Sequence, residues 1–241
     1  MPQAQEGSEP VPPQLLELIE NLAKFHREHE RFYSQAPLGQ AQEIQRYSRV
    51  LKALAAHWSK VEPSDHAGAS PFAGAEDLNP PGLVSESGFL FMEGGDEPAE
   101  VGQMKRELAT RAGDMETIGD WLANAMEQSW AIAGALAKYP QLADVLGERH
   151  RIIANDWLSA EMQLLIGRLL RRAIELLEEV DFRAEAVRAD LAERRSYSPV
   201  LFSASELLDR ASDLMAESAT LVHDNDRRWR VFGDRVAQLL A

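Results

Sequence analysis

The chain has no cysteine among its 241 residues. It can therefore form no disulfide, no thiolate-liganded zinc or iron–sulfur site, and no covalent intermediate on a cysteine nucleophile. The glycine-rich loops that bind nucleotide phosphates and the Gly-x-Ser-x-Gly turn of many hydrolases are missing as well. No catalytic constellation is recognisable in what remains, and our expectation leans towards a protein that is not an enzyme.

Proline is also absent from three long stretches, residues 99–139, 141–198 and 200–241. A proline inside a helix costs roughly 3 kcal/mol, and apolar residues recur in these stretches at three- and four-residue steps. The pattern is typical of long helices. It predicts helices over residues 100–138 and 141–180, a shorter piece over 184–195, a break near Pro199, and a last helix opened by a Ser203–Glu206 capping box.

The helix predicted over residues 141–180 is apolar on two adjacent faces. Trp157 lies on one of them, and Leu158 and Leu165 lie on the other. Trp130 lies on the apolar face of the preceding helix. A helix that is apolar around most of its circumference belongs at the centre of a bundle, so we expect these side chains in the core.

The N-terminal part predicts a different organisation. After a disordered start over residues 1–12, residues 13–62 are expected to form an antiparallel helical hairpin that turns at residues 37–39. Residues 63–103 are rich in proline and glycine and predict a loop or linker. Residues 104–241 form the long-helix bundle and pack with the hairpin as one domain. The predicted fold is all-α, an extended bundle of about five main helices with coiled-coil character.

The chain carries 39 acidic against 25 basic residues, a formal net charge of −14. Nucleic-acid binding draws most of its affinity from basic residues that neutralise phosphates, so we expect no nucleic-acid partner. The charge is typical of a solvated exterior, and recognition of a basic partner is the alternative interpretation. Without an apolar run of about 20 residues or a basic, apolar N-terminal leader, we expect no transmembrane segment and a cytoplasmic protein.

Two histidines are candidate metal ligands. His26 and His29 lie three residues apart on the apolar stripe of the first helix and could share one ion with help from a neighbouring helix. The predicted hairpin places them opposite Arg49 and Arg46, which are cations, so we interpret them as packing residues. Metal binding, with His150 as a third candidate ligand, is the alternative. None of the six histidines follows an acidic residue by three positions, which disfavours a carboxylate-bridged di-iron site.

A second ionisable group lies where the two central helices are expected to face each other. Its members are Glu148, His150, Asp156 and Glu161 with Asp120 and Glu127. Carboxylates beside a histidine suit acid–base or metal chemistry. We interpret Glu161 as solvated and His150 as packed against Trp130. In the last helix, Asn225 falls on the apolar stripe, which predicts a buried amide that sets the register between helices.

The loop contains one apolar island, Phe89, Leu90, Phe91 and Met92. We interpret the island as an anchor to the core, and docking to a partner or covering a pocket is the alternative. Together these observations predict a non-enzymatic acidic helical bundle that binds a protein partner, as an assembly factor, chaperone or scaffold does. A bundle holding a metal or organic cofactor through core histidines is the second hypothesis, and homo-oligomerisation stays open.

Overall fold

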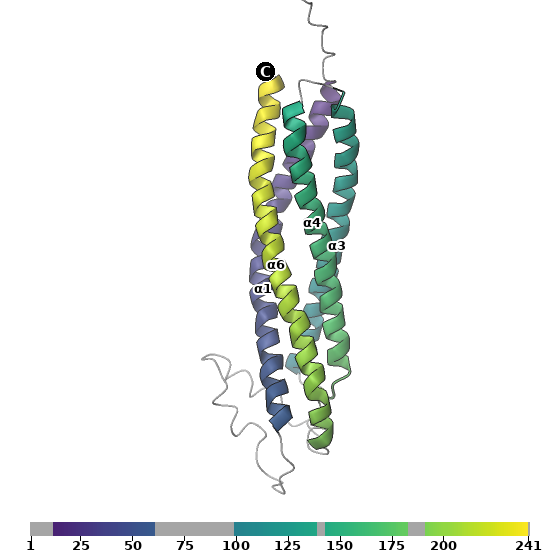
Figure 1. The fold of residues 1–241 in the computed structure, drawn as a ribbon, viewed down its shortest axis with the longest axis vertical. Helices are drawn as coiled ribbons and strands as arrows, with labels where there is room; N and C mark the ends of the chain where they lie inside the picture. Colours follow the sequence, from purple (N-terminus) through teal and green to yellow (C-terminus); the bar gives the residue numbers. More distant parts are fainter. Residues whose placement is uncertain (1–11, 61–98, 139–142, 183–190, 241) are drawn as a thin grey trace, which may run out of the picture. The chain divides into compact units, whose positions relative to one another are not determined.

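The computed structural model describes residues 12–60, 99–138, 143–182 and 191–240. These residues form four helices and no strand (Figure 1). The helices are α1 (Pro13–Lys60), α3 (Ala99–Leu136), α4 (Ala143–Glu178) and α6 (Leu191–Leu240). The all-α prediction is confirmed. Within the described ranges, no helix has an apolar stretch long enough to cross a lipid bilayer.

The predicted hairpin is wrong, because α1 runs without a break through residues 37–39. A Cβ at Gly39 would meet nothing within 4 Å, and the backbone there does not adopt the left-handed conformation of a turn. A proline removes one helical hydrogen bond, and the helix resumes its packing directly afterwards through buried Ala41 and Ile44. One long helix therefore replaces two, which accounts for four helices instead of about five.

The predicted break near Pro199 is also wrong. Pro199 lies inside α6, and so do Ser203 and Glu206, whose spacing suggested a helix start. Packing holds the helix together across the proline. Ser198 Oγ donates a hydrogen bond to the carbonyl of Ala55 in α1 (2.8 Å), and Leu201 is fully buried. These tertiary contacts outweigh the local preference of proline for a helix end.

The two central helices match their predicted positions to within two residues at each end, since α3 covers Ala99–Leu136 and α4 covers Ala143–Glu178. Most of the predicted loop, residues 63–98, lies outside the described residues, and α3 occupies its last five positions. Most of the short piece over 184–195 is also outside, with α6 beginning at Leu191.

The chain divides into two compact units, and the boundary between them falls inside every helix. Unit 1 comprises Met1–Gln40, Met115–Leu164 and Leu214–Ala241, and unit 2 comprises Ala41–Asp114 and Leu165–Asp213. Each unit therefore takes one segment from each of the four helices. Apart from the hairpin, which the continuous α1 contradicts, the predicted division into a loop over residues 63–103 and a long-helix bundle over residues 104–241 stays a prediction.

In unit 2, α1 packs antiparallel to both α3 and α6. Tyr47 donates a hydrogen bond to Glu107 of α3. On the α6 side, Ser48 Oγ donates to the carbonyl of Ser205 (2.9 Å), and Ser212 Oγ donates to the carbonyl of Ala41 (3.0 Å). The core is otherwise apolar. It contains Ile44, Leu51, Leu54, Trp58, Met104, Leu108, Ile166, Leu170, Leu177, Phe182, Leu201 and Leu208.

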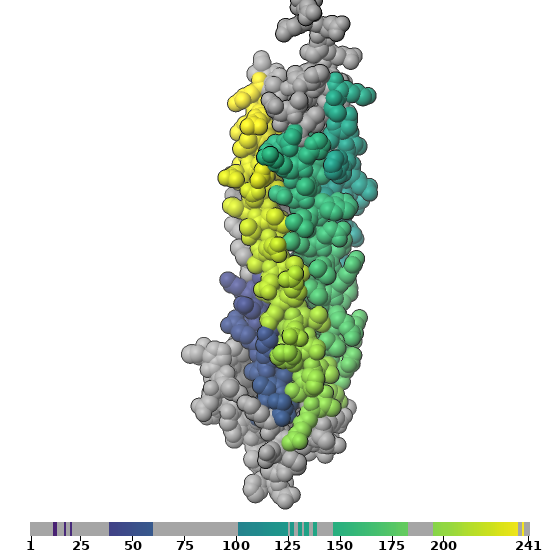
Figure 2. All heavy atoms as spheres, viewed as in Figure 1, coloured from purple at the N-terminus to yellow at the C-terminus, as the bar shows by residue number. Residues whose placement is uncertain are grey.

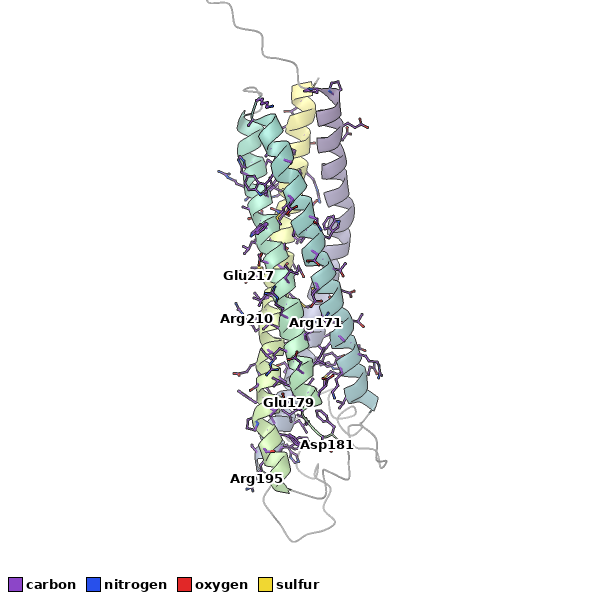
Figure 3. The ribbon with its side chains drawn as sticks, turned by 90° about the vertical axis from the view of Figure 1, so that its right-hand side faces the viewer. Arg171, Glu179, Asp181, Arg195, Arg210 and Glu217 are labelled. Atoms are coloured by element: carbon purple, nitrogen blue, oxygen red, sulfur yellow. The ribbon has the colours of Figure 1, made fainter. Side chains whose placement is uncertain are left out.

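The exterior of unit 2 along α4 and α6 carries charges of both signs. The side chains of Arg171, Glu179, Asp181, Arg195 and Arg210 are labelled in Figure 3. All of them except half-buried Asp181 are exposed. Mixed charge of this kind is typical of a solvated surface.

In unit 1, α4 packs antiparallel to α3 and to α6. The α3/α4 contact is close at Gly119, where an added Cβ would lie 2.7 Å from Leu164 Cγ and 3.2 Å from the carbonyl oxygen of Ala160. The α4/α6 contact includes Ser159 and Ser218, whose hydroxyls lie 3.1 Å apart. The apolar part of this core contains Met115, Ile118, Leu122, Met126, Ile152, Ile153, Met162, Leu214, Trp229 and Phe232.

Candidate functional site

The predicted histidine site is not assembled by the described side chains. His26 and His29 lie in α1, but their side chains are outside the described part of the structure. Because α1 is continuous, the predicted placement of these histidines opposite Arg49 and Arg46 across a hairpin is wrong.

His150 is exposed, and its ring packs against Trp130 at a centroid distance of 5.6 Å, as the sequence predicted. Among the residues with described side chains, no group of three or more His, Asp or Glu could hold a metal ion. Metal or cofactor binding through His26, His29 and His150 stays a prediction.

The apolar island of Phe89, Leu90, Phe91 and Met92 also lies outside the described residues. Both interpretations of this segment, as a core anchor and as a docking peptide, therefore stay predictions.

The ionisable residues of α4 do not converge on one site. Successive residues of a helix are rotated by about 100°, so Glu148, Asp156 and His150 project in different directions. Glu161 lies on the same face as His150 but three helical turns away. Glu148 accepts a hydrogen bond from Arg228 of α6 (3.0 Å), Asp156 is buried, and Glu161 is exposed. The arrangement lacks the close pairing that general acid–base catalysis requires.

Instead, polar residues line the buried contact between α4 and α6 in unit 1. We refer to this contact as the polar seam. Its members are Arg149, Asp156, Ser159 and Gln163 of α4 with Ser218 and Asn225 of α6, all at most 7% exposed. The α4 members follow one another at three-, four- and seven-residue steps, which keeps them on one helix face.

Asn225 is the centre of the polar seam. Its Nδ2 donates hydrogen bonds to Asp156 Oδ1 (2.7 Å) and to the carbonyl of Ile152 (3.0 Å). Its Oδ1 accepts a hydrogen bond from Nδ2 of Asn155 (3.0 Å). The prediction of a buried amide is confirmed. A shift of α6 by one turn would break all three bonds, so this residue is well placed to set the register.

A second layer of the polar seam lies further along α4. Gln163 Nε2 donates a hydrogen bond to Ser218 Oγ (2.6 Å), and the Ser159 hydroxyl lies 3.1 Å from the same oxygen. Hydrogen bonds between buried side chains compensate the loss of water that burial imposes on each group.

Burial changes the ionisation of two members of the polar seam. It raises the pKa of Asp156 to about 7, although the hydrogen bond from Asn225 acts in the opposite direction. It lowers the pKa of Arg149 to about 10, and the guanidinium carbon lies 6.0 Å from the centre of the Phe232 ring. Asp156 contacts the amide of Asn225 and the indole of Trp229 rather than a nucleophile and a base, so we interpret the seam as structural.

The most unusual feature of unit 1 is on its exterior. Trp130 of α3 is 52% exposed, and Trp157 and Leu158 of α4 are 50% and 45% exposed. The prediction that these side chains lie in the core is therefore wrong. With His150, they form what we call the aromatic surface, on the exterior of the α3/α4 pair. Figure 2 shows one face of the chain, on which atoms of α3 and α4 lie side by side.

Three exposed acidic side chains lie within one to three helical turns of the aromatic surface. Glu127 precedes Trp130 by about one helical turn, Asp120 lies two turns further away, and Glu161 follows Trp157 by about one turn. All three are exposed, and we call them the acidic rim. The nearest exposed base on α4 is Arg151, whose contact with Glu148 is a loose 3.7 Å.

The sequence placed Trp130, Trp157 and Leu158 on apolar helix faces, but it did not predict that they form an exposed surface. Helical periodicity shows that a face is apolar, but it does not show whether another helix of the same chain covers that face. It also missed Arg149, because a charged residue is usually solvated. The available signal was its seven-residue spacing from Asp156 on the same face of α4.

Comparisons with protein-family models, with curated proteins and with solved structures find no match to this chain. Function therefore has to be argued from the described side chains themselves. The aromatic surface and the polar seam are the two arrangements in unit 1 that an ordinary soluble bundle does not require.

Proposed function

We propose that this chain is a non-enzymatic acidic helical protein that binds a protein partner, as an assembly factor, chaperone or scaffold does. The observation that supports the proposal is the aromatic surface, where two tryptophans and a leucine of unit 1 are about half exposed. Contiguous exposed apolar residues rimmed by polar ones are typical of interaction sites. Tryptophan is among the residues most enriched in the energetically dominant parts of protein interfaces.

The energetics favour a covered surface. Burial of apolar area contributes about 25 cal/mol per Å², so two tryptophans and a leucine that become covered can contribute several kcal/mol to binding. In the free protein the same side chains stay in contact with water, so this contribution to the free energy is not realised. The polar seam, by contrast, supports no catalytic proposal, since its buried carboxyl group contacts Asn225 and not a reacting group.

The test is retention of a partner from an extract of the native cells. The full chain is immobilised as wild type, as the double variant Trp130→Ala/Trp157→Ala, and as the control Phe202→Ala. Phe202 is 48% exposed but lies in unit 2, so its removal deletes a comparable exposed aromatic elsewhere. Quantitative mass spectrometry then compares the bound proteins.

We expect a protein that is retained in near-stoichiometric amount by the wild type and by Phe202→Ala, and that is lost by about tenfold with the double variant. Circular dichroism of the three proteins checks that they are equally folded. If no retained protein distinguishes the double variant from the wild type, the aromatic surface is not a partner site and the proposal fails.

A further inference from the structure

We propose that the aromatic surface binds a basic amphipathic helix of the partner, seated along the α3/α4 pair of unit 1. This inference rests on the proposed function and specifies the chemistry of the partner. Three observations carry it: the spacing of the exposed tryptophans, the close packing of the two helices that carry them, and the distribution of charge around them.

The spacing of the two tryptophans suits a helix. Trp130 lies level with His150, because their rings are in contact, and Trp157 follows His150 by seven residues on the same helix. Seven residues correspond to a rise of about 10 Å. This rise is the separation of the two tryptophans along the helix axis, and they lie on neighbouring helices. Apolar side chains at positions i and i+7 of a partner helix seated along the α3/α4 pair have the same axial separation, so each could contact one tryptophan.

The α3/α4 pair that carries the tryptophans is close-packed at Gly119, which lies 11 residues before Trp130 on α3. At Gly119 the two helices approach so closely that even a methyl group would lie 2.7 Å from Leu164 Cγ. An interlocked helix pair of this kind changes little when a ligand binds. A preorganised surface loses little conformational entropy on binding, which favours affinity.

The charge distribution favours a positively charged partner. Residues 115–164, the α3 and α4 segments of unit 1 with their connection, contain seven acidic and three basic residues, a net charge of −4. The α6 segment, residues 214–241, contains four of each and is neutral. The aromatic surface therefore lies on the acidic side of unit 1, within the acidic rim of Asp120, Glu127 and Glu161.

Basic side chains of a partner can contact both the acidic rim and the tryptophan rings. Lysine and arginine pair with the carboxylates of the acidic rim, and they are also attracted to the face of a tryptophan ring, where the interaction is worth about 0.5–2 kcal/mol. Electrostatic complementarity also accelerates association and discriminates against acidic competitors. A partner helix with one apolar face and basic flanks satisfies all of these contacts together.

Other occupants fit less well. A second copy of the chain would bring a second acidic rim against the first, and like charges oppose such contact. The chain's own island of residues 89–92 is flanked by Glu86, Glu93 and Asp96, which are acidic too. Nucleic acids and anionic lipid surfaces carry the same sign of charge as the rim.

The experiment uses the full chain and two synthetic helical peptides of about 20 residues. Both peptides carry leucines at i, i+3, i+4 and i+7 positions; one has lysine and arginine at the flanking positions and the other has glutamate there. Binding is measured by fluorescence anisotropy of labelled peptide. The protein variants are Trp130→Ala/Trp157→Ala, Asp120→Lys/Glu127→Lys and the control Phe202→Ala.

We expect micromolar binding of the basic peptide and at least about tenfold weaker binding of the acidic one. The tryptophan variant should lose about tenfold in affinity. The charge-reversal variant should lose affinity and also the sensitivity of binding to an increase in salt from about 50 to about 300 mM. Phe202→Ala should bind like the wild type.

Equal binding of both peptides, no binding of either, or unchanged binding by the tryptophan variant would overturn the inference. If the tryptophan variant is misfolded by circular dichroism, the charge-reversal variant decides, because it keeps both tryptophans. Light scattering that shows self-association dependent on Trp130 and Trp157 would identify a second copy as the occupant and would also overturn it.

The two proposals fail in different ways. If a cellular partner is retained through the tryptophans but neither peptide binds, the partner-binding function stands and the basic-helix inference is wrong. Suppose instead that retention of every cellular protein is independent of the tryptophans while the basic peptide still binds through them. The preference of the surface for a basic helix is then supported, and the proposed binding of a cellular partner through this surface is wrong.

Discussion

The two units use the same helix in different ways. In unit 2, α4 buries Ile166, Leu170, Ala173 and Leu177 at three- and four-residue steps. In unit 1, the same helix buries Arg149, Asp156, Ser159 and Gln163 at seven-, three- and four-residue steps, with buried isoleucines between the first two. The periodic pattern therefore determines which residues face inward. The type of side chain at those positions determines how much their burial contributes to stability.

The difference extends to the exterior and to hydrogen bonding. Buried serines of unit 2, such as Ser48 and Ser212, donate to backbone carbonyls of a neighbouring helix. Its charged residues pair nearer to the surface, as Lys52 does with Asp209. Unit 1 places polar groups inside and exposes two of its tryptophans, Trp130 and Trp157. We infer that unit 2 is the better optimised for stability and that unit 1 carries the binding role.

The largest expected effect concerns the apolar core of unit 2. Leu170 is fully buried, so Leu170→Ala should lower the free energy of unfolding by about 3 kcal/mol through lost burial and a residual cavity. Leu165→Ala is the matched control, since Leu165 lies on the same helix and is 42% exposed. Urea denaturation measures both variants. Similar losses for the two would contradict the contrast between core and surface on α4.

The next effect tests the polar seam through pH. Burial raises the pKa of Asp156 from an ordinary value of 3.8 to about 7 in the folded chain. Between these values the folded state holds a proton that the unfolded state has released, so stability falls as pH rises from about 4 to about 7 and then levels off. Asp156→Asn removes this loss and can keep the hydrogen bond from Asn225.

The stability of Asp156→Asn relative to the wild type should therefore rise by about 2.5 kcal/mol from pH 5 to about pH 8. Urea midpoints at the two pH values measure it. Ser159→Ala is the control, because it alters the same polar seam without a titrating group and should shift stability equally at both pH values. A wild type whose stability is constant from pH 5 to 8 would contradict the prediction.

The smallest effect tests the close contact between α3 and α4 in unit 1. Gly119→Ala should destabilise the protein by about 1 kcal/mol, because overpacking costs more than the gain in helix propensity returns. Gly134→Ala lies on the same helix, where an added Cβ would meet nothing within 4 Å, and should stabilise by a few tenths of a kcal/mol or more. Thermal unfolding compares the two, and stabilisation by both variants would show that Leu164 moves aside easily.

Much of the fold followed from local pattern. The bounds of α3 and α4 could be predicted because periodicity and the absence of proline agree over more than 30 residues in each helix. The continuity of α1 and α6 could not, because Pro37 and Pro199 are local signals that tertiary packing overrides. Ser198 shows how, since its bond to α1 has no trace in the nearby sequence.

The candidate site was harder to predict from the sequence, for a related reason. The burial of Asn225 could be predicted, since a polar residue on an apolar stripe is conspicuous. The exposure of Trp130 and Trp157 could not be predicted, because it depends on which faces the other helices leave uncovered. Exposure is a property of the assembled unit and not of any single helix.

The uneven exposure of the tryptophans also gives the protein a built-in optical reporter. Trp58 and Trp229 are only 1% and 2% exposed, whereas Trp130 and Trp157 are about half exposed. A small quencher such as acrylamide should reach the exposed pair first and leave the buried pair emitting. Any molecule that covers the α3/α4 exterior should shield that pair, so occupancy can be followed in unlabelled protein by its own fluorescence.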